Sequence, residues 1–149
     1  MNFKEKVYHH YQSFLKDKMD ALQHTLNELS ESAKHETKST AGDKHETALA
    51  MLQIEQENTR TQYREALEQK TQLDRIDIML NSPAIVKGSL LKTDKGYFFL
   101  SIALGKAMID GIPVIAISPQ SPLGARLMGL KKKDSVEMNG IIYHVESID

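Results

Sequence analysis

The chain has 149 residues, which is enough for one ordinary domain or two small ones. It contains no cysteine, which excludes a disulfide framework and a Cys-ligated zinc site and favours a reducing, cytoplasmic location. The net charge of −1 gives no general affinity for nucleic acid, and no apolar run approaches the ~18 residues of a membrane span. The first residues also lack the apolar stretch of a secretory signal. We therefore expect a protein without membrane association or sequence-specific DNA binding.

Composition divides the chain near Asn81-Ser82-Pro83. Residues 1–80 contain one of the 8 glycines, none of the 4 prolines, and 11 Lys and Arg against 14 Asp and Glu. Residues 81–149 contain the other 7 glycines, all 4 prolines, and 8 basic against 6 acidic residues. The first part is rich in strong helix formers, and the second is rich in turn and strand residues. The sequence therefore predicts an α+β protein with a helical domain at 1–80 and a mixed domain at 81–149.

Apolar residues recur three or four positions apart along the first helical segment. Such spacing predicts one buried stripe on a helix that packs against a partner helix. The stripe consists of Tyr8, Tyr11, Leu15, Met19, Leu22, Leu26, Leu29 and Ala33.

A second segment repeats this spacing with more polar members, so a slipped register is possible there. Its stripe consists of Leu49, Leu52, Gln56, Thr59, Tyr63, Ala66, Lys70 and Leu73. Between the segments, residues 30–43 contain no large apolar side chain and include the only glycine of the first 80 residues. Ser, Thr and Asp there favour caps and turns over helix. We therefore predict a long antiparallel helical hairpin, or coiled coil, that turns between residues 34 and 43 and has an acidic tip near 34–46.

The tip contains Gly42-Asp43-Lys44-His45-Glu46. If residue 43 opens the second helix, Asp43 and Glu46 lie on one face of its first turn. An Asp and a Glu three residues apart can form a capping box for the helix. They can equally supply carboxylate oxygens to magnesium, which binds one or two carboxylates and several waters. Local spacing alone favours capping, because any helix start prefers these residue types, and a cap leaves part of each carboxylate free for a second role.

The tetrapeptide Lys-His-Glu-Thr occurs twice near the tip, beginning at Lys34 and at Lys44. A chain reversal between the copies could bring His35, Glu36, His45 and Glu46 together. Imidazole and carboxylate suit zinc and related ions, so a metal site belonging to the tip itself is an alternative to solvated polar side chains.

The second half predicts strands around one short helix. Apolar runs at 84–92 and 97–104 flank the hairpin signal Thr93-Asp94-Lys95-Gly96, and a short β-rich run covers 114–118. Ser121-Pro122 opens a predicted helix over 123–130, with proline at a first helical position. Runs at 134–138 and 141–147 flank Asn139-Gly140, a strong type I′ hairpin signal. Between the predicted helix and the run at 134–138, Lys131-Lys132-Lys133 fits a solvated turn better than a dedicated contact with a partner.

The hairpin tip and the segment Ser121-Pro122-Leu123-Gly124-Ala125-Arg126-Leu127-Met128-Gly129 together resemble GreA/GreB-type transcript-cleavage factors. The resemblance covers about residues 15–149. It implies that the C-terminal domain is FKBP-like and docks on the β′ rim of bacterial RNA polymerase through Ser121, Pro122, Leu123 and Arg126. It also implies that the coiled coil enters the secondary channel of the polymerase.

By the same resemblance, Asp43 and Glu46 act in trans at the polymerase active centre. There they help to hold the polymerase's second magnesium ion, and backtracked RNA is cleaved near its 3′ end. The protein would then be an elongation factor with no cofactor of its own, and no enzyme by itself. Two alternatives remain: a channel-binding regulator that does not stimulate cleavage, and a coiled-coil interaction module unrelated to transcription.

Overall fold

The computed structural model describes the backbone of residues 1–37 and 42–149, and the side chains of 1–36 and 46–149. These residues form two compact units. One unit combines Met1–Gln12 with Gln72–Asp149, and the other is Ser13–Thr71. The first turns of the N-terminal helix thus belong with the C-terminal half of the chain, whereas composition places the division at Asn81-Ser82-Pro83.

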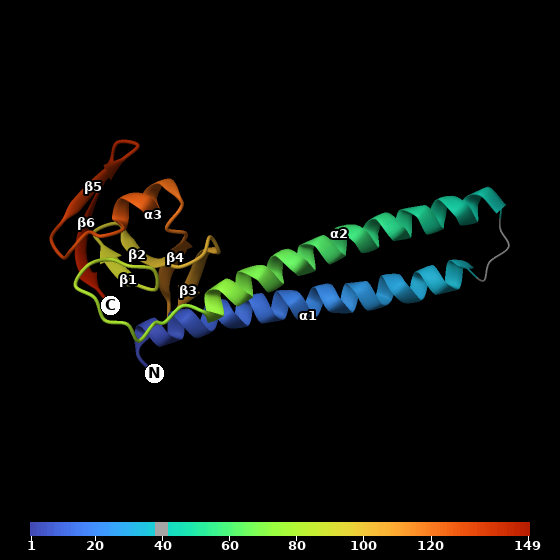
Figure 1. The fold of residues 1–149 in the computed structure, drawn as a ribbon, viewed down its shortest axis with the longest axis horizontal. Helices are drawn as coiled ribbons and strands as arrows, with labels where there is room; N and C mark the ends of the chain where they lie inside the picture. Colours follow the sequence, from blue (N-terminus) through green and yellow to red (C-terminus); the bar gives the residue numbers. More distant parts are fainter. Residues whose placement is uncertain (38–41) are drawn as a thin grey trace. The chain divides into compact units, whose positions relative to one another are not determined.

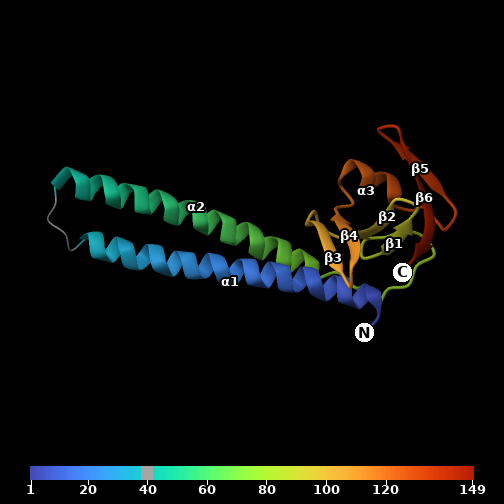
Figure 2. The same ribbon diagram turned by 180° about the vertical axis from the view of Figure 1, so that it is seen from behind.

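Two long helices confirm the predicted helical hairpin (Figures 1 and 2). Helix α1 runs over Phe3–Thr37 and α2 over Gly42–Asp74. The predicted reversal between 34 and 43 includes residues 38–41, which lie outside the described residues. Within the helical unit, α1 and α2 lie side by side in opposite directions in both views.

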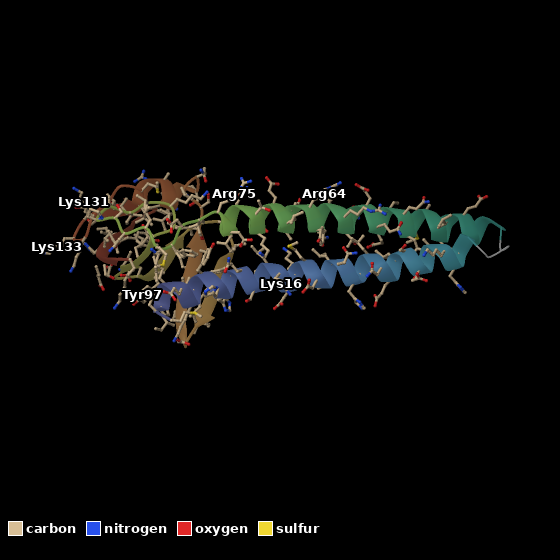
Figure 3. The ribbon with its side chains drawn as sticks, turned by 60° about the horizontal axis from the view of Figure 1, so that its bottom comes forward. Lys16, Arg64, Arg75, Tyr97, Lys131 and Lys133 are labelled. Carbon is tan, nitrogen blue, oxygen red and sulfur yellow. The ribbon has the colours of Figure 1, made fainter. Side chains whose placement is uncertain are left out.

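The burial pattern confirms the predicted stripes on both helices. Along α1 from Ser13 to Ala33, the side chains that are not exposed are the predicted Leu15, Met19, Leu22, Leu26, Leu29 and Ala33, with Ser30 beside them. All eight predicted positions of α2 are at least half-buried, the polar Gln56, Thr59 and Lys70 included. Thr59 is accommodated because its hydroxyl donates to the carbonyl of Glu55, 2.8 Å away. Figure 3 shows side chains of both helices in the space between them.

The other unit contains a six-stranded mixed sheet in the order β3-β4-β2-β1-β6-β5. Neighbouring strands are antiparallel except β2 and β4, which are parallel. The strands and the short helix α3 are β1 (Leu90–Thr93), β2 (Gly96–Leu100), β3 (Gly105–Ile109), β4 (Ile112–Ile117), α3 (Pro122–Leu127), β5 (Ser135–Met138) and β6 (Ile141–Ile148).

Alternate residues of β2 enter two different cores, because successive side chains of a strand point to opposite faces. Phe98 and Leu100 join the core on the α3 side, with Ile85, Leu91, Leu127 and Val145. Phe99 lies on the opposite face, against the first turns of α1. The sheet is therefore covered by a helix on each side, and the N-terminal residues of the chain supply one of the two covers.

Two tyrosines of α1 bond to this unit through their hydroxyl groups. Tyr11 packs its ring on Phe99, with centroids 6.2 Å apart, and its hydroxyl donates to the carbonyls of Gly105 at 2.8 Å and Val114 at 3.2 Å. Tyr8 donates to the carbonyl of Leu73 at 2.9 Å, in the last turn of α2. Because the last carbonyls of a helix lack intrahelical donors, the Tyr8 hydroxyl supplies a donor to one of the carbonyls at the end of α2.

The predicted strand positions are partly wrong. Residues 84–89 precede β1 as a loop, in which the fully buried Ile85 exchanges backbone bonds with Leu130 and Gly129 instead of extending the sheet. Gly88 has a φ of 100° and turns the chain away from an extended path. Strand β3 is missing from the sequence analysis, and β2 ends at Leu100 instead of 104. The hairpin between β1 and β2 and the Asn139-Gly140 hairpin are confirmed.

Within the part of the chain that the structure describes, no helix is both long and apolar enough to cross a membrane.

The Tyr11 hydroxyl bonds predict a measurable loss of stability in Tyr11→Phe. Two carbonyls lose their donor, so the free energy of unfolding should fall by about 1–3 kcal/mol, as measured by urea denaturation. Burial raises the Tyr11 pKa from 10.0 to about 12, so the stability it contributes is complete below pH 10 and is lost as the pH rises towards 12. Tyr11→Phe should therefore weaken the alkaline loss of stability.

The matched control is Tyr63→Phe on α2, a half-buried tyrosine whose hydroxyl forms no hydrogen bond with the described residues. It should change the free energy of unfolding by less than about 0.5 kcal/mol. Equal losses in the two variants would contradict the importance of the Tyr11 bonds.

Candidate functional site

Ser121 starts α3 through two hydrogen bonds of one hydroxyl group. The Ser121 Oγ donates to the carbonyl of Ser118 at 2.6 Å and accepts from the backbone N–H of Gly124 at 3.1 Å. Pro122 occupies the first helical position, where its missing N–H costs nothing. The predicted helix start is thus confirmed, and the Ser121 hydroxyl is already used by the fold.

Gly124 is required by close packing. A Cβ at this position would lie 1.9 Å from the Ser118 carbonyl oxygen and 2.8 Å from the Ser121 Oγ. The glycine therefore allows α3 to approach the segment that follows β4, and Ser121, Pro122 and Gly124 each have a role in the fold of this segment.

The helix ends earlier than predicted, at Leu127 instead of residue 130. Met128 is extended, with ψ of 129°, and Gly129 has a φ of 83°, which turns the chain so that its N–H donates to Ile85. The left-handed conformation at glycine is a common helix ending.

The four predicted docking residues divide into two exposed and two partly buried side chains. Pro122 and Arg126 are exposed, and the Arg126 guanidinium donates to the Glu137 carbonyl at 2.7 Å. Leu123 packs against the core on the α3 side. A partner that approaches this end of the sheet unit would therefore meet Pro122 and Arg126 first.

The predicted catalytic residues belong to the first turns of α2, which begins at Gly42. Positions 43 and 46 are three apart, and such positions are neighbours on a helix surface. The Glu46 side chain is exposed, whereas that of Asp43 lies outside the described residues. The choice between a helix cap and a metal ligand therefore stays open at Asp43.

The second metal hypothesis concerns His35, Glu36, His45 and Glu46. Among the side chains that the structure describes, no group of three or more His, Asp or Glu residues is arranged to hold a metal ion. His45 is outside that set, so this hypothesis remains a prediction. His35 is exposed, and Glu36 is half-buried.

The run Lys131-Lys132-Lys133 forms an exposed turn before β5, as predicted. The Lys131 N–H donates to the Asp134 carboxylate at 2.8 Å, and Lys133 has a φ of 79°. Figure 3 shows the Lys131 and Lys133 side chains at the outer edge of the sheet unit.

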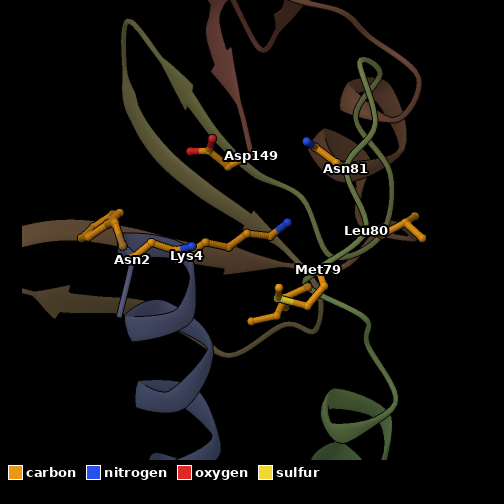
Figure 4. A pocket seen from close by; sticks show the side chains of 8 residues that line it. Asn2, Lys4, Met79, Leu80, Asn81 and Asp149 are labelled. Atoms are coloured by element: carbon orange, nitrogen blue, oxygen red, sulfur yellow. The ribbon is translucent and has the colours of Figure 1, made fainter.

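Sequence reasoning missed a pocket of about 280 Å³ in the sheet unit (Figure 4). Its walls are the start of α1, the segment after α2, and Asp149 beyond β6. Lys4 lines it and is only 9% exposed. A signal was present, because extending the α1 stripe back from Tyr8 by four residues reaches Lys4.

Comparison with known proteins finds no relative: no protein-family model, no curated protein and no solved structure matches the chain significantly.

The contact distances at Gly124 predict that Gly124→Ala is destabilising. The added Cβ would overlap a backbone oxygen, which has less freedom to move than a side chain, so the cost should be about 1–3 kcal/mol in urea denaturation. Ala125→Ser, at the exposed neighbouring position, should cost less than about 0.5 kcal/mol. A Gly124→Ala protein as stable as the parent would mean that the segment at Ser118 moves freely.

Proposed function

We propose that the protein is a cytoplasmic transcription elongation factor that binds bacterial RNA polymerase and stimulates cleavage of backtracked RNA. In this proposal the helical hairpin enters the secondary channel, and the sheet unit, taken as an FKBP-like domain, docks at the β′ rim. The protein is not an enzyme alone, since the polymerase supplies the active centre.

The observation that carries the proposal is the position of the acidic pair. Asp43 and Glu46 lie in the first turns of the 33-residue helix α2, which runs antiparallel to α1. A helix of 33 residues is about 50 Å long. A narrow pair of helices this long can carry two carboxylates into a channel that a globular domain cannot enter.

The chemistry assigned to the pair is metal binding in trans. Hydrolysis of a phosphodiester by two metal ions requires both ions about 3.5–4 Å apart. Carboxylates that arrive from another protein can complete the ligands of a weakly held second magnesium ion. Held by Asp43 and Glu46, the ion would favour attack of water on the phosphorus, so the bond to the upstream 3′ oxygen would break and the RNA would keep a new 3′ hydroxyl group in register.

Docking on the polymerase through the α3 end of the sheet unit is supported by the residues Ser121, Pro122, Leu123 and Arg126. Pro122 and Arg126 offer an exposed apolar ring and a guanidinium, which can pair with carboxylates of a partner. Ser121 and Leu123 hold the helix in position below them, one through its cap and the other through the core.

The catalytic assignment predicts that Asp43→Asn with Glu46→Gln abolishes stimulation without unfolding the hairpin. Asn caps a helix about as well as Asp, and Gln preserves a capping box, so the free energy of unfolding should change by well under ~1 kcal/mol. Cleavage of RNA in a stalled polymerase complex should fall steeply while polymerase binding persists. Raised magnesium should restore part of the activity, because the lost ligands weaken ion occupancy.

A control pair, Glu55→Gln with Glu57→Gln, makes the same charge change farther along α2 and should cleave like the parent. Full cleavage activity in the Asp43→Asn, Glu46→Gln protein would sink the catalytic assignment and leave the two carboxylates as helix caps.

The docking assignment predicts that Pro122→Ala with Arg126→Glu weakens polymerase binding by about tenfold or more, as expected for the loss of ~1.4 kcal/mol. Both side chains are exposed, and only the bond of Arg126 to the Glu137 carbonyl is lost, so the thermal transition should move less than in a variant at Leu123, which packs against the core. The matched control is Lys132→Glu, an equal charge reversal at another exposed position. Equal affinities for the two charge-reversed proteins would move the interface elsewhere.

The alternative in the same fold is a regulator that occupies the channel without promoting cleavage. It is favoured if the parent protein binds polymerase but leaves the RNA of a stalled complex intact. An interaction module unrelated to transcription would bind no polymerase at all.

A further inference from the structure

The pocket at the start of α1 contains a lysine in an unusual setting. Lys4 is 91% buried by its surroundings, since only 9% of its surface is exposed. The Lys4 ammonium group forms no hydrogen bond or ion pair with the residues that the structure describes. Figure 4 shows its extended side chain reaching across the pocket towards the segment of Met79 and Asn81. The ammonium nitrogen itself is open to the pocket, because no buried side-chain nitrogen or oxygen of the described residues lacks a hydrogen-bond partner. Its N–H groups are therefore available to a bound molecule.

The electrostatics around Lys4 favour an anionic group at one end of the pocket. Burial lowers the Lys4 pKa, and the carboxylates of Asp149 and Asp77 oppose that effect from beyond ion-pair distance. The positive end of the 35-residue α1 lies at the same place, with Asn2 capping the N–H of Glu5 at 2.8 Å. A carboxylate that bonded to the Lys4 ammonium would gain from both charges.

Asp149 favours a positively charged group at another part of the pocket. Its backbone N–H donates to the Leu90 carbonyl at 2.8 Å and its carbonyl accepts from the Leu90 N–H at 3.1 Å, which fixes the residue beside β1. Its carboxyl side chain lines the same pocket as Lys4. A ligand with negative charge alone would meet this carboxylate unfavourably, whereas a ligand that also carries an ammonium group would pair with it.

The remaining wall is apolar. Met79 and Leu80 line the pocket and are 76% and 54% exposed in the free protein. Covering such side chains gives a favourable free energy that depends on the apolar area removed from water. The pocket volume of about 280 Å³ is below the range of about 300–1,000 Å³ for drug-sized ligands, so the occupant is small.

We propose that this pocket binds a small apolar α-amino acid, with its carboxylate on Lys4, its ammonium on Asp149 and its side chain against Met79 and Leu80. This site is separate from the tip and from the α3 end, and it adds a ligand-binding activity to the proposed elongation function. An amino acid is the smallest common molecule that has all three groups the pocket requires. The site is independent of polymerase, so it can be tested on the protein alone.

The test measures binding of three related compounds to the whole protein by titration calorimetry and by ligand-observed NMR. L-leucine has all three groups, 4-methylpentanoate lacks the ammonium, and 3-methylbutylamine lacks the carboxylate. We expect L-leucine to bind at least about tenfold more tightly than either analogue. Equal binding of L-leucine and 4-methylpentanoate, or no binding of L-leucine at millimolar concentration, would overturn the proposal.

Two variants separate the two charged contacts. Lys4→Met keeps a long apolar side chain in the buried position and should weaken L-leucine binding by about tenfold or more. Asp149→Asn should lower the affinity for L-leucine to that for 4-methylpentanoate. Lys132→Met, the same substitution at an exposed site outside the pocket, should bind L-leucine like the parent.

Circular dichroism checks that each variant keeps the parent's helix content. Should Lys4→Met fail to fold, Asn81→Ala on the exposed wall replaces it, with a smaller expected loss of affinity. Undiminished L-leucine binding in folded Lys4→Met, or in the Asn81→Ala and Asp149→Asn proteins together, would also overturn the site.

Discussion

The sheet of this protein has apolar side chains on both faces. Tyr8 and Tyr11, near the beginning of the chain, cover one of these faces. Tyr8 and Tyr11 both pack their rings near Phe99, and their hydroxyls bond to the end of α2 and to the carbonyls of Gly105 and Val114. A sheet that is apolar on both faces must be covered on both. Helix α3 covers the face that carries Phe98 and Leu100, and the first turns of α1 cover the face that carries Phe99.

Because the first turns of α1 cover the sheet, the N-terminal residues belong to the same unit as the strands, and the chain does not divide into a helical half and a sheet half. The residues from 13 to 71 form the helical unit, where the stripes on α1 and α2 are mostly half-buried and include Gln56 and Lys70. Because most of these side chains are only half-buried, each removes little apolar surface from water and contributes little to the free energy of unfolding. Between residues 13 and 71 the two helices thus bury few apolar side chains, whereas the first turns of α1 belong to the sheet unit. Long helices of this kind agree with the proposed insertion into a channel.

Local signals in the sequence predicted those elements whose conformation is decided by their own residues. Asn139-Gly140 forms the expected hairpin with both φ angles positive, and Ser121-Pro122 starts α3 as expected. Strand β3 was missed although Asp110-Gly111, with φ of 52° and 76°, is an equally good hairpin signal between Ile109 and Ile112.

Other features depend on contacts between distant residues, which no local pattern contains. Ile85 was predicted in a strand because it is apolar and β-branched, but it is buried as part of a loop through its bonds to Gly129 and Leu130. The pocket around Lys4 forms only when the start of α1, residues 78–81 and Asp149 come together. At the tip, spacing identifies Asp43 and Glu46 as candidates, but capping and metal binding use the same residue types in the same places.

In the proposed function, the tip of the hairpin reaches the catalytic centre of RNA polymerase. The chain has no cysteine, so Thr47→Cys, at an exposed position one residue after Glu46, can carry a single iron chelate that generates hydroxyl radicals. In a complex with polymerase, we predict cuts in the polymerase chains next to the catalytic magnesium ion. Cuts confined to the outer surface of the polymerase, or none in a complex that has formed, would contradict the account.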